Sequence, residues 1–155
     1  MISRSLNTLD ALRIEASQNG YDYKTTEFLL TLINDFPQYN WRFGRKFSYR
    51  PLKTITLGPA EAHSQILALH ELGHAISQHL NFKIDIERLK MEVEAWEKAR
   101  KLADKYTIPV DEDLIQDELD SYRDWLHQKS RCPKCGLTRF QTPDSVYHCP
   151  LCEKL

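Results

Sequence analysis

The sequence lacks the features that mark a membrane-spanning, exported or highly charged protein. No apolar run approaches the ~20 residues that a membrane span needs, and the first ten residues contain no apolar segment typical of an export signal. Charge of one sign is also missing, because 21 lysines and arginines balance 22 aspartates and glutamates. This balance supports neither nucleic-acid binding by the whole chain nor disorder. We therefore expect a cytoplasmic protein with no membrane partner.

Cysteine is absent from the first 131 residues and then occurs four times near the C-terminus. The four cysteines form two C-x-x-C pairs with 13 residues between the pairs. In a small module without an export signal, this spacing favours a closed tetrahedral zinc site over disulfide bonds, with a redox or iron-binding role as the alternative. The cysteines are Cys132, Cys135, Cys149 and Cys152.

The position of these cysteines divides the chain into two parts. An apolar content of 41% over 155 residues is enough for one domain with a core and a small appendage. The C-terminal part has few apolar residues, so we expect its zinc ion to supply folding energy. We place a main domain at residues 1–129 and a zinc ribbon at residues 130–155.

Hydrophobic periodicity predicts helices on both sides of a short stretch of strands. Apolar and polar residues alternate from Trp41 to Arg50, which is typical of a half-buried strand, and Gly44 favours a turn within it. Elsewhere the apolar residues recur with a helical period. We predict an α+β fold, in which helices and a short antiparallel or mixed sheet form the main domain. The expected helices cover residues 1–20, 24–36, 60–80, 85–106 and 110–129, and the expected strands cover residues 41–50 and 52–57.

The helix expected at residues 60–80 contains the sequence His70-Glu71-Leu72-Gly73-His74. Helical spacing places His70 and His74 one turn apart on the same face, so both imidazoles can reach one metal ion. Glu71 stands beside them, in reach of a metal-bound water. On the same helical wheel His79 points to the opposite side, and His63 lies two turns earlier, so we expect neither to be a third ligand.

The next predicted helix provides that third ligand. Glu92 lies on the apolar stripe of this helix, whereas Glu94 lies on the charged side and is interpreted as a solvated residue. A buried ionised carboxylate is costly unless it is paired or bound to a metal, and the two histidines supply the place. The alternative is an ion pair between Glu92 and Arg88. We predict a zinc site formed by His70, His74 and Glu92.

Such a site favours hydrolysis. Three protein ligands leave zinc a position for water, and zinc lowers the pKa of that water to about 7. Glu71 would act as general base and then pass the proton to a leaving amine, which makes a protein or peptide the expected substrate. The strand expected to end at Leu57 would offer its backbone to an extended peptide. Tyr106, Tyr122 and His127 are the candidates for stabilising the oxyanion, and no spacing argument chooses among them.

These motifs resemble a known class of zinc peptidase. The H-E-x-x-H sequence at residues 70–74, with Glu92 on the next helix, is similar to the gluzincin metallopeptidases, and within that class it looks most like the small ImmA/IrrE-type proteins of bacteria and phages. The resemblance covers residues 25 to 106, and residues 92–95 match an E-x-x-A pattern, with Trp96 where that family usually has asparagine. It implies a zincin-like fold, one catalytic zinc held by the ligands above, and Glu71 as the catalytic base.

Three other classes of protein share part of this pattern. A metzincin would require glycine and histidine where this chain has Ser77 and Leu80. SprT-like DNA-linked proteases also join H-E-x-x-H to a C-terminal zinc ribbon, but they use a histidine as third ligand. The main alternative is a non-catalytic, regulatory zincin-fold protein, whose ribbon binds a protein or nucleic-acid partner. The expected cofactors are two zinc ions, one catalytic and one structural in the ribbon.

Overall fold

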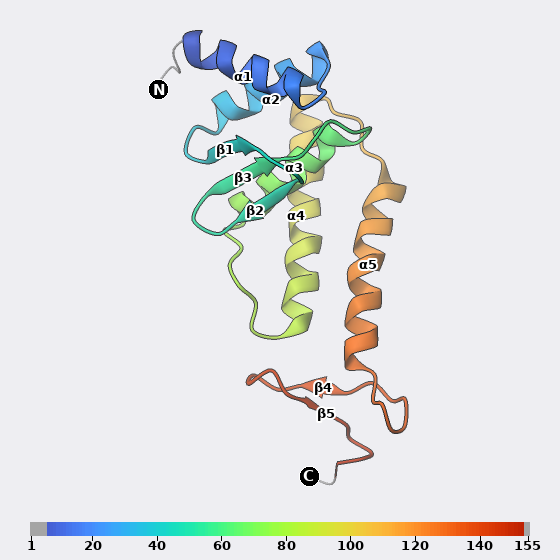
Figure 1. Cartoon of the computed structure of the whole chain (residues 1–155). Coiled ribbons are helices and arrows are strands. Elements are labelled where there is room, and N and C mark those ends of the chain that lie inside the picture. Colours follow the sequence, from blue (N-terminus) through green and yellow to red (C-terminus); the bar gives the residue numbers. More distant parts are fainter. Residues whose placement is uncertain (1–5, 154–155) are drawn as a thin grey trace.

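The computed structural model describes residues 6–153, which form an α+β fold of five helices and five short strands (Figure 1). The predicted fold class is therefore confirmed at this level, and the part of the first expected helix before residue 6 lies outside the described residues. No helix in the described part of the chain is both long and apolar enough to cross a membrane. The elements are α1 (Leu6–Gln18), α2 (Tyr23–Asp35), β1 (Asn40–Phe43), β2 (Ser48–Arg50), β3 (Thr54–Leu57), α3 (Ser64–Ile76), α4 (Asp85–Tyr106), α5 (Glu112–Ser130), β4 (Phe140–Gln141) and β5 (Tyr147–His148).

The first three strands form one mixed sheet in the order β1-β3-β2. The central strand, β3, pairs in parallel with β1 and antiparallel with β2. The single strand expected at residues 41–50 is thus two strands, separated by a turn that contains Gly44. Because β3 is hydrogen-bonded on both sides, its backbone cannot pair with a further strand, and the expectation that residues 54–57 bind an extended peptide was wrong. The edges of the sheet are β1 and β2.

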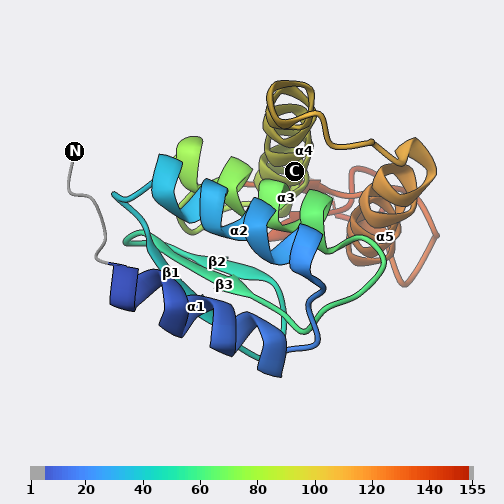
Figure 2. The same ribbon diagram turned by 90° about the horizontal axis from the view of Figure 1, so that it is seen from above.

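Apolar side chains from α2, β3 and α3 form the core beside this sheet. Leu32, Ile55 and Leu72, one from each element, are completely buried. Seen from above, the sheet lies between α1 on one side and α3 and α4 on the other (Figure 2). The packing fixes α3 against the sheet, and α3 is the helix that contains the H-E-x-x-H sequence.

Helices α3 and α4 approach each other closely at Gly73. A Cβ atom at this position would overlap the carbonyl oxygen of Ala95 on α4. Further along α4, the residues Ala99 and Ala103 are also small and buried. Only glycine permits so short a distance between the helix axes. The close approach brings Glu92, one turn before Ala95, to the histidine face of α3.

Helix α3 is shorter than the helix that periodicity predicted at residues 60–80. It starts at Ser64 and ends at Ile76. After its end, Gln78 adopts a left-handed φ of 54°. The backbone N–H of His79 then donates to the carbonyl of His74 at 3.1 Å, which folds the chain back on the helix end. The side chain of His79 therefore does not follow the helical wheel from which its direction was predicted.

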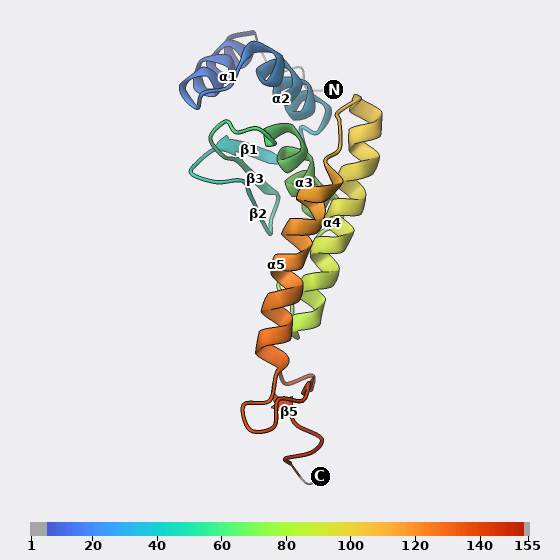
Figure 3. The same ribbon diagram turned by 90° about the vertical axis from the view of Figure 1, so that its right-hand side faces the viewer.

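The cysteine-containing segment lies at the far end of α4 and α5, which run side by side (Figure 3). Its strands β4 and β5 form a separate antiparallel pair. The buried carboxylate of Asp85, the first residue of α4, accepts a hydrogen bond from the Tyr147 hydroxyl at 2.7 Å and forms an ion pair with Lys129 at 3.1 Å. The backbone N–H of Asp85 donates to Gln141 at 2.7 Å. These contacts fix the segment to the start of α4 and the end of α5.

Candidate metal centres

Three ligand-type atoms converge between α3 and α4, from His70, His74 and Glu92, which we call the histidine–glutamate group. The Nε2 atoms of His70 and His74 lie 3.1 Å apart, and Glu92 Oε2 lies 3.2 Å from the first and 3.4 Å from the second. All three residues are less than 10% exposed. The alternative pairing of Glu92 with Arg88 is not seen among the described residues, because the carboxylate faces the two imidazoles. The structure therefore brings together the three residues that the sequence selected.

The spacing of these atoms fits a tetrahedral zinc ion. With zinc–ligand distances of about 2.0–2.1 Å, the ligands of a tetrahedral ion are about 3.3 Å apart. The measured separations of 3.1–3.4 Å match this value. Although burial alone would raise the pKa of Glu92, contact with the two histidines keeps that pKa below its usual value, so the group carries the negative charge that attracts a cation. The donor set of two imidazoles and one carboxylate is thus suited to zinc.

A second layer of side chains fixes the ring of His74. Its Nδ1 lies 2.8 Å from Nδ1 of His79, and Nε2 of His79 lies 3.1 Å from a carboxylate oxygen of Glu94. If Nε2 of His74 keeps its lone pair for a metal, Nδ1 carries the proton and donates it to His79. His79 then carries its own proton on Nε2 and donates it to Glu94. One tautomer at each ring satisfies the whole chain of contacts.

This chain of contacts corrects two expectations. His79 is not on the opposite side from the site but is buried against His74, because α3 ends before the position to which the wheel was extended. Glu94 is exposed, as expected of a solvated residue, yet it accepts a hydrogen bond from His79. Neither residue joins the group of converging ligand atoms. The only sequence signal for the contact between His79 and His74 was the position of a histidine five residues after a candidate ligand.

The ring of His70 is held by packing instead. It stacks on Trp96, with the ring centroids 4.0 Å apart and the planes at 26°. Its Nδ1 atom is buried and has no hydrogen-bond partner among the described residues. Trp96, which stands where the resembled family has asparagine, thus fills the space beside His70 with an apolar ring.

Glu71 lies next to the ligand group but does not join it. Burial raises the pKa of its carboxyl group to about 7, while His74 and a hydrogen bond from the backbone of Tyr49 act in the opposite direction. Tyr49 belongs to β2, so the edge strand of the sheet contacts this carboxylate directly. A carboxylate with a pKa near neutrality can accept a proton and release it again, which is the property that a general base needs.

The group lies in a cleft with a volume of about 490 Å³. Its walls come from β2 and the turn before it, from α3, from the loop that follows α3, and from α4 and α5. Of the three candidates for stabilising an oxyanion, only Tyr122 lines the cleft. Burial, the charge of Glu92 and a hydrogen bond to Glu92 raise the pKa of Tyr122 to about 12, so the hydroxyl keeps its proton at neutral pH. The hydroxyl of Tyr106 instead donates to Asp35 at 2.6 Å.

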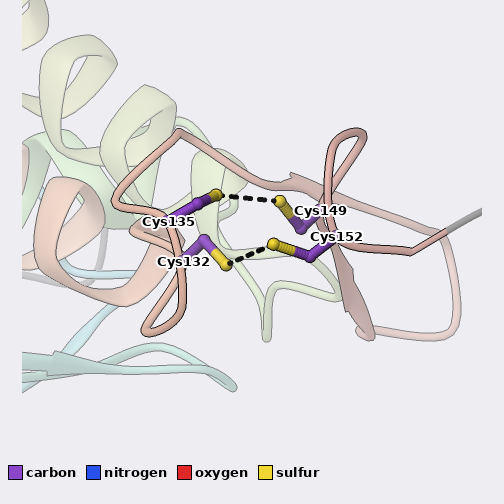
Figure 4. A group of neighbouring side chains, drawn as sticks. All are labelled: Cys132, Cys135, Cys149 and Cys152. Atoms are coloured by element: carbon purple, nitrogen blue, oxygen red, sulfur yellow. Dashed lines mark hydrogen bonds between the residues drawn. The ribbon is translucent and has the colours of Figure 1, made fainter.

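The four cysteines form a second group of ligand-type atoms, the four-cysteine group (Figure 4). The Sγ atoms of Cys132 and Cys152 lie 4.0 Å apart, and those of Cys135 and Cys149 lie 3.5 Å apart. For zinc–sulfur distances of about 2.3 Å, a tetrahedral ion places its sulfur ligands about 3.8 Å apart. All four are free thiols in the structure. Their spacing fits zinc, with no ligand position left for a substrate.

Backbone groups favour the thiolate form of Cys132. Hydrogen bonds from the backbones of Cys135 and Lys134 lower its pKa to about 6. The turn after the first C-x-x-C pair contains Gly136, whose φ of 77° is in the left-handed region that glycine adopts without strain. Such a turn directs backbone N–H groups at sulfur and prepares it to bind a metal.

Comparison with known proteins adds no further identification of either site. No family model, no curated protein and no solved structure matches the chain. The chain is therefore described by what it contains: an α+β fold with a histidine–glutamate group and a four-cysteine group, each spaced to hold a metal ion.

Proposed function

We propose that the chain is a zinc-dependent metallopeptidase with a zincin-like fold and a gluzincin-type site. The observation that carries this proposal is the convergence of His70, His74 and Glu92 at tetrahedral spacing, with the carboxylate of Glu71 beside them in an open cleft. A purely structural metal site is closed by its protein ligands. Three ligands in a cleft leave room for a reacting molecule instead.

The residues have separate roles in peptide hydrolysis. His70, His74 and Glu92 hold the zinc ion, which when bound acidifies water and polarises a carbonyl group. Glu71 accepts the proton of the attacking water and returns it to the leaving amine, a transfer for which a pKa near 7 is suited. Tyr122, still protonated at neutral pH, donates a hydrogen bond to the oxygen that becomes negative.

The substrate peptide binds in extended form along β2. This strand is an edge of the sheet, and its residues Ser48 and Tyr49 line the cleft. The outward N–H of Tyr49 already donates to Glu71, so the backbone of β2 offers a peptide its outward carbonyl, a partial form of strand addition. The contact of Tyr49 with Glu71 places a peptide bound there next to the catalytic base. The four-cysteine group holds a second zinc ion, which stabilises the C-terminal ribbon.

The experiment compares cleavage of a quenched-fluorescent peptide library by the wild type, Glu71→Gln and Glu97→Gln, with zinc measured in each sample. Glu97 is an exposed carboxylate on α4 and serves as the matched control. We expect wild-type cleavage in Glu97→Gln and a loss of at least about 100-fold in Glu71→Gln at unchanged zinc content. Equal cleavage by Glu71→Gln would exclude the mechanism, and absence of cleavage by the wild type would count against peptidase function.

A further inference from the structure

The cleft contains a guanidinium group held between aromatic rings. The Cζ atom of Arg88, on α4, lies 5.0 Å from the ring centroid of Trp125, 5.1 Å from that of Tyr122 and 5.7 Å from that of Phe82. The rings come from α5 and from the loop before α4. Cation–π contacts of this kind fix the direction of a long side chain that would otherwise sample many rotamers.

Arg88 has no carboxylate partner within the described residues. Arg13 and Arg100, in contrast, each have one, because Arg13 pairs with Glu27 at 2.9 Å and Arg100 pairs with Glu112 at 2.7 Å. The two acidic residues nearest to Arg88 along its own face of α4 are already engaged. Asp85 binds Tyr147 and Lys129, and Glu92 faces the histidines.

The donors of Arg88 are therefore largely free. A guanidinium group has five N–H donors; that of Arg88 contacts the hydroxyl of Tyr122 and lowers the pKa of Asp85 by its charge, without forming an ion pair with it among residues 6–153. Such a group, fixed in direction and unpaired, is arranged to bind a planar anion through two parallel hydrogen bonds. A carboxylate is the anion that a peptide carries.

Arg88 lies in the same cleft as His70, Glu71 and His74. Apart from Glu71 and Glu92, the charged residues that line this cleft are Arg88 and Lys46, and both are cationic. Lys46 lowers the pKa of Glu71, and Glu92 faces the two histidines, so neither carboxylate of the cleft forms an ion pair with Arg88.

We propose that Arg88 is a specificity residue that binds a carboxylate of the substrate, so that the preferred peptides carry a carboxylate close to the bond that is cleaved. The carboxylate belongs either to an Asp or Glu side chain or to the C-terminus of the peptide. This inference rests on the proposed peptidase function, because it assigns the substrate class of the same cleft.

A structural role for Arg88 makes a different prediction. If the guanidinium only joins α4 to α5 through Trp125 and Tyr122, its replacement lowers stability and affects all ligands equally. If it binds a carboxylate, its replacement removes the preference for acidic ligands and leaves the binding of neutral ligands unchanged. The charge of the ligand thus separates the two roles.

The experiment uses hydroxamate peptides, which anchor at the metal and extend into the cleft on either side of it. One pair extends from the N-terminal side and ends in leucine hydroxamate, with Glu or Gln before the leucine. A second set starts from a malonyl hydroxamate and continues as Leu-Glu amide, Leu-Gln amide, Leu-Gly amide or Leu-Gly with a free C-terminus. Dissociation constants are measured by calorimetry for the zinc-loaded full chain, for Arg88→Met, Arg88→Lys and Lys46→Met, and for the control Arg100→Met.

We expect at least one acidic member to bind about tenfold more tightly than its neutral partner, as a charged hydrogen-bonded pair predicts. The preference is retained in Arg100→Met and lost in Arg88→Met. A preference for the Glu members identifies a side-chain carboxylate, and a preference for the free C-terminus identifies a terminal one. If Arg88→Met does not fold, Arg88→Lys, which keeps the charge but not the two parallel bonds, is expected to retain only part of the preference.

Equal binding of acidic and neutral members would overturn the inference, as would an acidic preference that persists in Arg88→Met or is lost in Lys46→Met instead. Failure of every hydroxamate to bind the wild type is a different result, because it would count against the metal site and the proposed function. A uniform loss of affinity for all members in Arg88→Met would show a structural role only.

Discussion

The two imidazoles of the histidine–glutamate group are held by different interactions. Nδ1 of His74 is hydrogen-bonded to Nδ1 of His79, whereas His70 is stacked on Trp96 and has a buried Nδ1 atom with no partner in the described part of the chain. A hydrogen bond to the second nitrogen fixes both the tautomer and the orientation of a metal-binding histidine. Stacking fixes the orientation of the ring but not its tautomer. The zinc site should therefore depend more strongly on His79 than its distance from the ligands suggests.

Replacement of His79 by alanine tests this dependence. The change removes the acceptor for His74 Nδ1 and leaves a cavity beside the ring, so we expect the affinity of the cleft zinc to fall about 10- to 100-fold. Glu94→Gln is the matched control, and its effect should be smaller because the side chain of Glu94 is 53% exposed. Competition with a chromophoric chelator measures both affinities. Unchanged zinc affinity in His79→Ala would contradict the role assigned to this residue.

At the scale of single residues, the sequence predicted the direction of side chains inside regular helices. It did not predict the direction of side chains just beyond a helix end. Glu92 was placed correctly on the buried stripe because α4 continues without interruption from Asp85 to Tyr106. His79 was misplaced because its direction depends on where α3 ends and on the left-handed backbone at Gln78. Glutamine is not a residue that marks such a conformation in advance. The position of His79 therefore required the structure.

At the scale of elements, the site depends on the short distance between α3 and α4. Gly73 lies between the two histidines and faces Ala95, so the residue that permits the contact is part of the motif itself. The helices were predictable from periodicity. The sheet order was not, because pairing β3 between β1 and β2 is decided by contacts between residues far apart in sequence. For that reason periodicity could not identify β2 as the edge beside the cleft.

The substitution Gly73→Ala tests the contact between α3 and α4, because the two explanations predict opposite changes in stability. Helix propensity alone predicts that alanine stabilises the helix by about 1 kcal/mol relative to glycine. Overlap of the new Cβ with the carbonyl of Ala95 predicts the opposite, a loss of about 1–3 kcal/mol and weaker binding of the cleft zinc. Urea unfolding and zinc analysis measure the two effects. A stabilised variant with unchanged zinc affinity would show that the contact does not limit the site.

At the scale of the whole molecule, α4 connects the two candidate metal centres. Its first residue, Asp85, contacts the cysteine-containing segment, and Glu92 two turns later faces the histidines of α3. The boundary placed at residue 130 coincides with the end of α5. Contacts of Asp85 with Tyr147 and Gln141 nevertheless join the ribbon to the main domain. The two parts are linked at the base of α4 and α5, which periodicity and cysteine spacing did not indicate.

Removal of one ribbon thiol tests how far the two centres depend on each other. In Cys132→Ser we expect the ribbon zinc to be lost and the cleft zinc to be retained, because the ligands of the cleft lie on α3 and α4. The melting temperature should fall, since the contacts of Asp85 with the ribbon no longer form. Lys134→Ser changes an exposed residue of the same turn and is the control. Simultaneous loss of both zinc ions would show that the cleft site requires an intact ribbon.

The most direct test of the central claim is the number of zinc ions per chain in wild type, Glu92→Gln and Glu97→Gln, measured by native mass spectrometry. Both substitutions remove one negative charge from α4, but only Glu92 faces the histidines. The two groups of ligand atoms predict two zinc ions in the wild type and in Glu97→Gln, and one in Glu92→Gln. A single zinc ion in the wild type, or two in Glu92→Gln under the same conditions, would contradict a zinc site formed by His70, His74 and Glu92.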